Sequence, residues 1–158
     1  MFAQYRLIFI FLLMCFFSAA SAQQMSMADA PTSGHWMTGE EILAEYTDST
    51  QEGMYSWLQD GVPVGFSESH DANAQTRYQE FGSEDFTIRG VWIVKNDVIC
   101  YYYSDWRMSP ENCFYVLKSG NCYYHYDTER ERNFEGLESW NSVSYDKGTQ
   151  PSCVPNIS

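Results

Sequence analysis

The stretch from Gly90 to Tyr126 constrains the fold of this chain more than any other segment. It consists of short runs rich in aromatic and β-branched residues, which favour strands over helices. Asn96-Asp97 tolerate the positive φ of a tight hairpin, and Ser119-Gly120 form a second turn. We therefore predict four consecutive antiparallel strands here, at Val91–Lys95, Val98–Tyr103, Cys113–Lys118 and Asn121–Tyr126.

Weaker strand signals stand on both sides of this stretch. A hairpin signal at Gln59-Asp60-Gly61 separates two runs, and the segment 134–145 is expected to add a last strand or a short helical turn. Strands spaced eight to twelve residues apart with few crossovers are typical of a meander that closes on itself. We predict a mainly β fold, an antiparallel meander or barrel of seven to eight strands. The further expected strands are Met54–Leu58, Val62–Ser69 and Gln75–Phe81, and Phe86–Arg89 leads into the central stretch.

One short N-terminal helix is expected before the strands. Thr38 and Glu41 have the spacing of a capping box, and apolar residues follow on one helical face, which predicts a helix over Gly39–Tyr46. Trp36 precedes the cap and is expected to act as a hydrophobic staple against the first apolar residues of the helix. A helix this short requires packing against the sheet.

The first 22 residues have the features of a signal peptide. Arg6 supplies a positive charge near the start, and Leu7–Phe17 forms an apolar core. The small residues before Gln23 predict cleavage between Ala22 and Gln23. The apolar run is shorter than the ~20 residues that a membrane span needs. We expect a periplasmic or secreted protein with no stable membrane span after cleavage.

The remaining chain divides by composition into three parts. Residues 23–36 are small and polar and are expected to form a disordered lead-in. Residues 37–145 hold the predicted helix and strands and form the β-barrel domain. Residues 146–158 are predicted to form a C-terminal tail, which a disulfide would hold against the barrel.

The charge balance narrows the range of partners. The chain has 21 acidic and 9 basic residues, a net charge of −12, which becomes −13 when the leader with its single basic residue, Arg6, is removed. Nucleic acids and anionic membrane surfaces need clusters of Lys and Arg, so both are excluded as partners. A strongly negative protein attracts cationic partners.

Four cysteines remain after the leader, and the predicted register ranks their pairings. An even count in an exported chain predicts disulfides. Cys100 and Cys113 lie nearly opposite on neighbouring strands, whereas Cys113 and Cys122 are about 13 Å apart and Cys100 and Cys122 about 9.5 Å, beyond the ~7 Å limit for a bridge. This leaves the pairs Cys100–Cys113 and Cys122–Cys153. The spacing matches no zinc or redox motif, so we predict no metal and no cofactor.

Strand alternation sorts the central stretch into two faces. The cysteines share one face, across which we expect the tail and the helix to lie. The other face would line the barrel and supplies the candidate ligand pocket, made of Trp92, Tyr101, Tyr103, Phe114, Tyr123 and His125. The simpler expectation is that these side chains fill the core, because an eight-stranded interior is only just wide enough for its own side chains. A cavity of about 300 Å³ or more would favour ligand binding.

Few residues suggest catalysis or partner binding. Glu68, His70 and Asp71 are close in sequence and suggest acid–base or metal chemistry, but polar neighbours in a loop are usually solvated. No nucleophile motif or phosphate-binding loop is present in the sequence, so we assign no catalytic residue. Trp106, in a long loop, is the candidate contact for a partner protein.

Two groups of residues carry a resemblance to a known kind of protein. They are the capped helix start at Thr38–Glu41 and the pattern of Gly90-Val91-Trp92, Asn96–Tyr101 and Asn112–Val116. Together they resemble small, exported, uncharacterised proteins of proteobacteria with a lipocalin-like antiparallel barrel. The resemblance covers roughly 37–126 and implies a periplasmic or secreted β-barrel without an established activity.

Three functional hypotheses follow from these observations. The first is a non-enzymatic binding or structural module that holds an unknown small ligand in the barrel. The second is an acidic inhibitor or envelope-interaction protein that acts on a cationic protein such as a lysozyme-like enzyme. An enzyme is the third and ranks last, because no catalytic constellation stands out.

Overall fold

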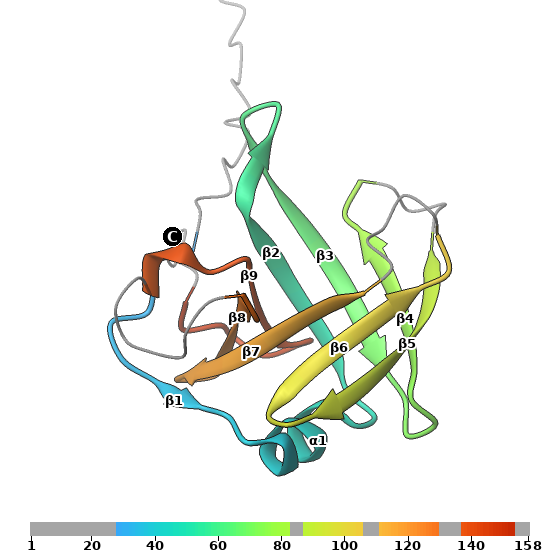
Figure 1. Cartoon of the computed structure of the whole chain (residues 1–158). Coiled ribbons are helices and arrows are strands. Elements are labelled where there is room, and N and C mark those ends of the chain that lie inside the picture. The colour runs from blue at the N-terminus through green and yellow to red at the C-terminus, as the bar shows by residue number, and fades with distance from the viewer. Residues whose placement is uncertain (1–27, 83–86, 106–110, 130–136, 154–158) are drawn as a thin grey trace, which may run out of the picture.

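A closed antiparallel barrel dominates the computed structural model, which describes residues 28–82, 87–105, 111–129 and 137–153 (Figure 1). Its strands are β2 (Thr50–Gln59), β3 (Val62–His70), β4 (Gln75–Glu80), β5 (Ile88–Lys95), β6 (Val98–Tyr103), β7 (Asn112–Ser119), β8 (Cys122–Asp127) and β9 (Ser142–Asp146). Each strand pairs with its neighbours in sequence, and β9 closes the barrel by pairing with both β8 and β2. The predicted fold class is confirmed, and eight strands in this order are compatible with a lipocalin-like fold.

The hairpin turns have the backbone conformations that their sequences predict. Asn96 and Asp97 have φ of 52° and 62°, and Asp60 and Gly61 have φ of 52° and 80°. Such paired left-handed residues match the right-handed twist of the flanking strands. The β2–β3 hairpin extends beyond the rest of the barrel, at the end opposite the helix α1 (Gly39–Tyr46) (Figure 1).

Helix α1 closes one end of the barrel (Figure 1). It has the predicted bounds and the predicted capping box, in which the Glu41 N–H donates to Thr38 Oγ1 and the Thr38 N–H donates to Glu41 Oε2 at 2.7 Å. Its buried residues, Ile42 and Tyr46, point into the barrel and pack with Trp92. The helix therefore does not lie across the cysteine face, because its apolar side fits the open end of the barrel instead.

A two-residue strand, β1 (His35–Trp36), precedes α1 and pairs with β7. It lies in the segment expected to be a disordered lead-in, so part of that segment is an ordered addition to the sheet. Trp36 is not the staple of the helix: its ring packs on Tyr126, with centroids 5.1 Å apart. Met37, which directly precedes the cap, packs in one cluster with Ile42 and takes that place.

Both predicted disulfides are present, and they lie on the outer, cysteine-bearing face. Cys100 pairs with Cys113 directly across β6 and β7, and Cys122 on β8 pairs with Cys153 in the tail. The tail and the η1 turn (Leu137–Ser139) cover the part of this face around Cys122 in an apolar cluster. Disulfides fit a protein of an oxidising compartment.

Some expectations fall outside the described residues. These are the signal peptide (1–22), its cleavage step after Ala22, and the partner-contact candidate Trp106. Of the helices that the structure describes, none is long and apolar enough to cross a membrane.

Candidate functional site

The barrel interior contains a cavity of about 220 Å³ that is partly open to solvent. This volume is smaller than the roughly 300 Å³ typical of ligand pockets, but the interior is not filled by its own side chains. One helix and seven of the eight barrel strands contribute to its walls, which combine aromatic rings with buried polar groups. The lining residues are Tyr46, Gln51, Tyr55, Phe66, Glu68, His70, Tyr78, Tyr101, Tyr103, Asn112, Phe114, His125, Ser142 and Ser144.

The strand register brings polar residues from distant parts of the chain into this cavity. Glu68 on β3 lies opposite Gln51 on β2 and Tyr78 on β4, so all three side chains point to the same face of the sheet. On the other side of the barrel, His125 on β8 lies opposite Ser142 on β9. A shift of register by one residue would turn all of these groups outward.

The predicted pocket residues divide into two groups. Tyr101, Tyr103, Phe114 and His125 line the cavity. Trp92 and Tyr123 face the same interior but pack in the apolar cluster around α1. The Trp92 ring contacts His70 edge-on, and the Tyr123 hydroxyl donates to Glu45 Oε2 at 2.6 Å. Whether the four lining residues contact a ligand stays a prediction.

Glu68 is the acidic group of the cavity and is 6% exposed. Thr76 Oγ1 donates to its Oε1 at 2.8 Å, and the Tyr103 hydroxyl donates to the same oxygen at 2.6 Å. Burial disfavours the charged form and raises the pKa of Glu68 to about 7, although both hydrogen bonds act in the opposite direction. At neutral pH this carboxyl therefore exchanges readily between its charged and neutral forms.

Two buried histidines face the same cavity. His125 Nε2 lies 2.9 Å from the Tyr46 hydroxyl, and His70 Nε2 lies 3.1 Å from the Tyr101 hydroxyl. Burial lowers the pKa of His125 to about 4 and that of His70 to about 3. Both rings are neutral at pH 7. His70 Nδ1 is buried and has no hydrogen-bond partner among the described residues.

Tyrosines form the remaining polar edge of the cavity. The Tyr55 hydroxyl donates to the Tyr78 hydroxyl at 2.8 Å, which in turn donates to Glu80 Oε1 at 2.9 Å. The rings of Tyr101 and Tyr103 are parallel within 3°, with centroids 5.9 Å apart. Burial raises the pKa of each of these four hydroxyls, so they remain protonated near neutral pH.

Ser142 and His125 have the spacing of a nucleophile and its base. Ser142 Oγ lies 3.2 Å from His125 Nδ1. In a serine hydrolase the second nitrogen of the histidine donates to a carboxylate, which stabilises the imidazolium that forms. Here that nitrogen contacts the Tyr46 hydroxyl, and burial already disfavours the imidazolium. The contacts of His125 with Ser142 and Tyr46 are better suited to hold the His125 and Tyr46 rings in place than to activate the serine.

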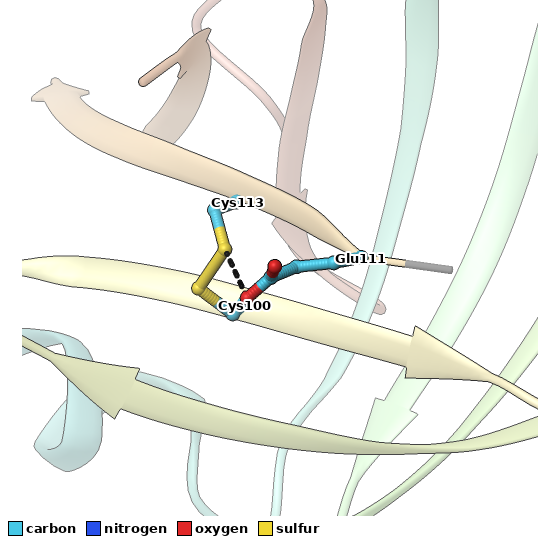
Figure 2. A group of neighbouring side chains, drawn as sticks. All are labelled: Cys100, Glu111 and Cys113. Atoms are coloured by element: carbon cyan, nitrogen blue, oxygen red, sulfur yellow. Dashed lines mark hydrogen bonds between the residues drawn. A yellow bond between two sulfur atoms is a disulfide. The ribbon is translucent and has the colours of Figure 1, made fainter. Parts of the chain in front are cut away.

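The described residues contain one group with the spacing of a metal site, and it lies outside the cavity. It comprises Cys100, Glu111 and Cys113 (Figure 2). The two sulfur atoms are joined in a disulfide, so neither is available as a thiolate ligand. Glu111 Oε1 lies 3.5 Å from the Cys113 sulfur, the contact dashed in Figure 2, but disulfide sulfur has no proton to donate. This group is therefore a disulfide that links β6 to β7, with a carboxylate beside it.

Sequence reasoning missed the role of Glu68 and His70. It placed Glu68 on the strand Val62–Ser69 and His70 in the following loop, and it took both with Asp71 as a solvated group. Both lie on β3 and point inward, and only Asp71 is in the turn. Asp71 Oδ1 accepts from the N–H groups of Asn73 and Gln75, as expected for a turn residue. The signal was present: Phe66, Glu68 and His70 continue the inward alternation of the strand.

Comparison of the chain with family models, with curated proteins and with solved structures found no match.

Proposed function

We propose that this protein is a periplasmic or secreted, non-enzymatic binding module that holds one small ligand inside its barrel. The observation that carries the proposal is the cavity of about 220 Å³, which contains a buried acid and two buried neutral histidines. Buried polar groups destabilise a core unless they are paired, so their concentration around a void favours a binding site over a simple core. Export is supported by the leader sequence and the disulfides.

The size of the cavity limits the ligand. A cavity of about 150 Å³ lined by apolar side chains is known to hold benzene. A cavity of about 220 Å³ accommodates a single ring with a short polar substituent.

Native mass spectrometry of the protein purified from its own host tests this function. We expect a population heavier than the bare chain by the mass of one single-ring compound. Phe114 lines the cavity, so Phe114→Trp would fill the space and remove this population. Tyr115→Trp, on the outward face of the same strand, is the matched control and would leave it unchanged. A protein that never carries a ligand, or that retains it in Phe114→Trp, contradicts the proposal.

A second candidate function is supported by the tip of the β2–β3 hairpin. Trp57, Leu58 and Val62 are 47%, 48% and 60% exposed on this projecting arm (Figure 1). Exposed apolar residues at the tip of an acidic protein suit an inhibitor of a cationic enzyme of the lysozyme type. A lysozyme assay tests this: inhibition by the protein that Trp57→Ala relieves supports the inhibitor role, and undiminished lysis at saturating protein rules it out.

A further inference from the structure

The charge distribution inside the cavity indicates what kind of ligand it takes. Both hydrogen bonds to Glu68 end at Oε1, and no described residue donates to Oε2. Among the described lining residues there is no lysine or arginine. The carboxyl of Glu68 therefore has hydrogen-bond support on one oxygen and no counter-ion within the described cavity wall.

The histidines do not compensate this charge. Burial keeps both imidazoles neutral at pH 7, so neither supplies a positive charge to Glu68. An anionic ligand would meet a carboxylate, and the described wall offers no cation to pair with it. A cationic ligand would supply the charge that the described wall lacks, and the pairing would favour the ionised form of Glu68.

Aromatic rings line the rest of the space. Phe66, Tyr78 and Tyr103 pack in one cluster beside Glu68, and Tyr101 stacks on Tyr103. The face of an aromatic ring attracts cations through its quadrupole, and more strongly where water is excluded. A buried acid surrounded by aromatic rings is the arrangement that recognises organic ammonium ions.

Resting on the binding function proposed above, we propose that the ligand is a small organic cation, a protonated amine on a single ring, with its ammonium group at Glu68 Oε2. The ring would lie among the aromatic side chains of the cavity, and His70 Nδ1 would offer a further hydrogen-bonding group. The strongly negative charge of the chain, −12 before removal of the leader, would also attract such a ligand.

The pH dependence of binding distinguishes this ligand from a neutral one. A cation binds the ionised carboxyl, so its affinity falls about tenfold per pH unit below the pKa of Glu68, near 7. A neutral ligand that accepts the proton of Glu68 shows the opposite trend. The other titratable groups among the described lining residues are neutral between pH 5 and 8; they are Tyr46, Tyr55, His70, Tyr78, Tyr101, Tyr103 and His125.

Calorimetric titration with three matched probes tests the inference. Benzylamine, benzyl alcohol and benzoate present the same ring with a positive, a neutral and a negative substituent. At pH 8 we expect benzylamine to bind at least about tenfold more tightly than benzyl alcohol, and benzoate most weakly. Benzylamine affinity should fall between pH 7 and pH 5.

Two variants locate the effect. Glu68→Gln keeps the shape of the side chain and removes its charge, so benzylamine binding should weaken about 30-fold or more while benzyl alcohol still binds. Glu40→Gln removes one exposed acid on the outer side of α1 and should change neither affinity. These two variants carry the same net charge and separate a local pairing from general attraction.

The results distinguish a failure of the cationic-ligand proposal from a failure of the proposed binding function. If benzyl alcohol or benzoate binds as tightly as benzylamine, or if Glu68→Gln keeps the preference, the ligand is not a cation although the cavity still binds. If none of the three probes binds the native protein, both the binding function and the cationic ligand are overturned.

Discussion

Two regions of the barrel interior share strands β6, β7 and β8 but are filled differently. In the packed region next to α1, Met37, Ile42, Trp92, Ile99 and Val116 are each at most 3% exposed and form one apolar cluster. In the cavity, Glu68, His70 and His125 face a void. The packed region follows the rule of apolar close packing, and the cavity departs from it.

The difference separates a region that stabilises the fold from the region that we propose binds a ligand. Apolar side chains in the cavity would fill it and would avoid the free-energy cost of burying an acid. Polar groups that replace a better-packed core are expected at functional sites, where the surrounding structure supplies the stability. The packed region and the disulfides provide that support.

Truncation in the two regions should have unequal effects on stability. Ile99→Ala leaves a hole in the packed region and should lower the free energy of unfolding by about 2–5 kcal/mol. Phe114→Leu, beside an existing void, should lower it by less than about 1.5 kcal/mol. Denaturant unfolding of both variants measures the contrast, and equal losses would show that the cavity wall is packed as tightly as the core.

Removal of the buried acid should stabilise the protein at alkaline pH. The pKa of Glu68 is raised from 4.5 to about 7 in the folded state, so ionisation destabilises the fold as pH rises from about 4.5 through 7. Glu68→Gln should therefore be more stable than the native chain by about 3 kcal/mol at pH 8, and equal to it near pH 4. Thermal unfolding at both pH values is the measurement, and an unchanged or lower stability at pH 8 would contradict a buried, uncompensated carboxyl.

The histidines should give the opposite dependence on pH. Their folded pKa values, about 3 and about 4, lie below the ordinary 6.5, so their contribution to stability is lost as pH falls below 6.5. Between pH 4.5 and 6.5 the unfolded chain binds two more protons on the histidines and one fewer on Glu68 than the folded chain. The free energy of unfolding should therefore rise by about 1.4 kcal/mol per pH unit. The slope should roughly double in Glu68→Gln, and a flat profile in that variant would place the histidines in contact with solvent.

Loss of the helix cap should have the smallest effect. Thr38→Ala removes the acceptor for the Glu41 N–H and should cost about 1 kcal/mol. Because α1 covers the packed region, amide exchange should accelerate in the helix first and leave the β3–β4 side of the cavity protected. Equal acceleration throughout the barrel would show that α1 and the cavity unfold together.

Much of the fold is predictable from local sequence signals. The Asn96-Asp97 turn and the capping box of Thr38 fix the bounds of β6 and α1 because each depends on adjacent residues only. The register between those turns also predicts the disulfide pairs. Strand β1 gave no signal, since two residues, His35 and Trp36, are too short a run for any periodicity.

The cavity was harder to predict than the strands around it. The alternation on β3 placed Glu68 with Phe66, but the polar run after it resembled a loop, and His70 was assigned there. The void itself depends on how fourteen side chains from eight different elements pack together, which no local pattern encodes. Trp92 and Tyr123 were grouped correctly by face, but the alternation does not show how far along the barrel a side chain lies.

A ¹³C NMR titration of the Glu68 side-chain carboxyl is the most direct test of the account. The resonance can be assigned by its absence in Glu68→Gln. The account predicts a pKa near 7 in the free protein and a lower value in the presence of benzylamine. A pKa near the ordinary 4.5 that benzylamine leaves unchanged would contradict a buried acid that pairs with a cationic ligand.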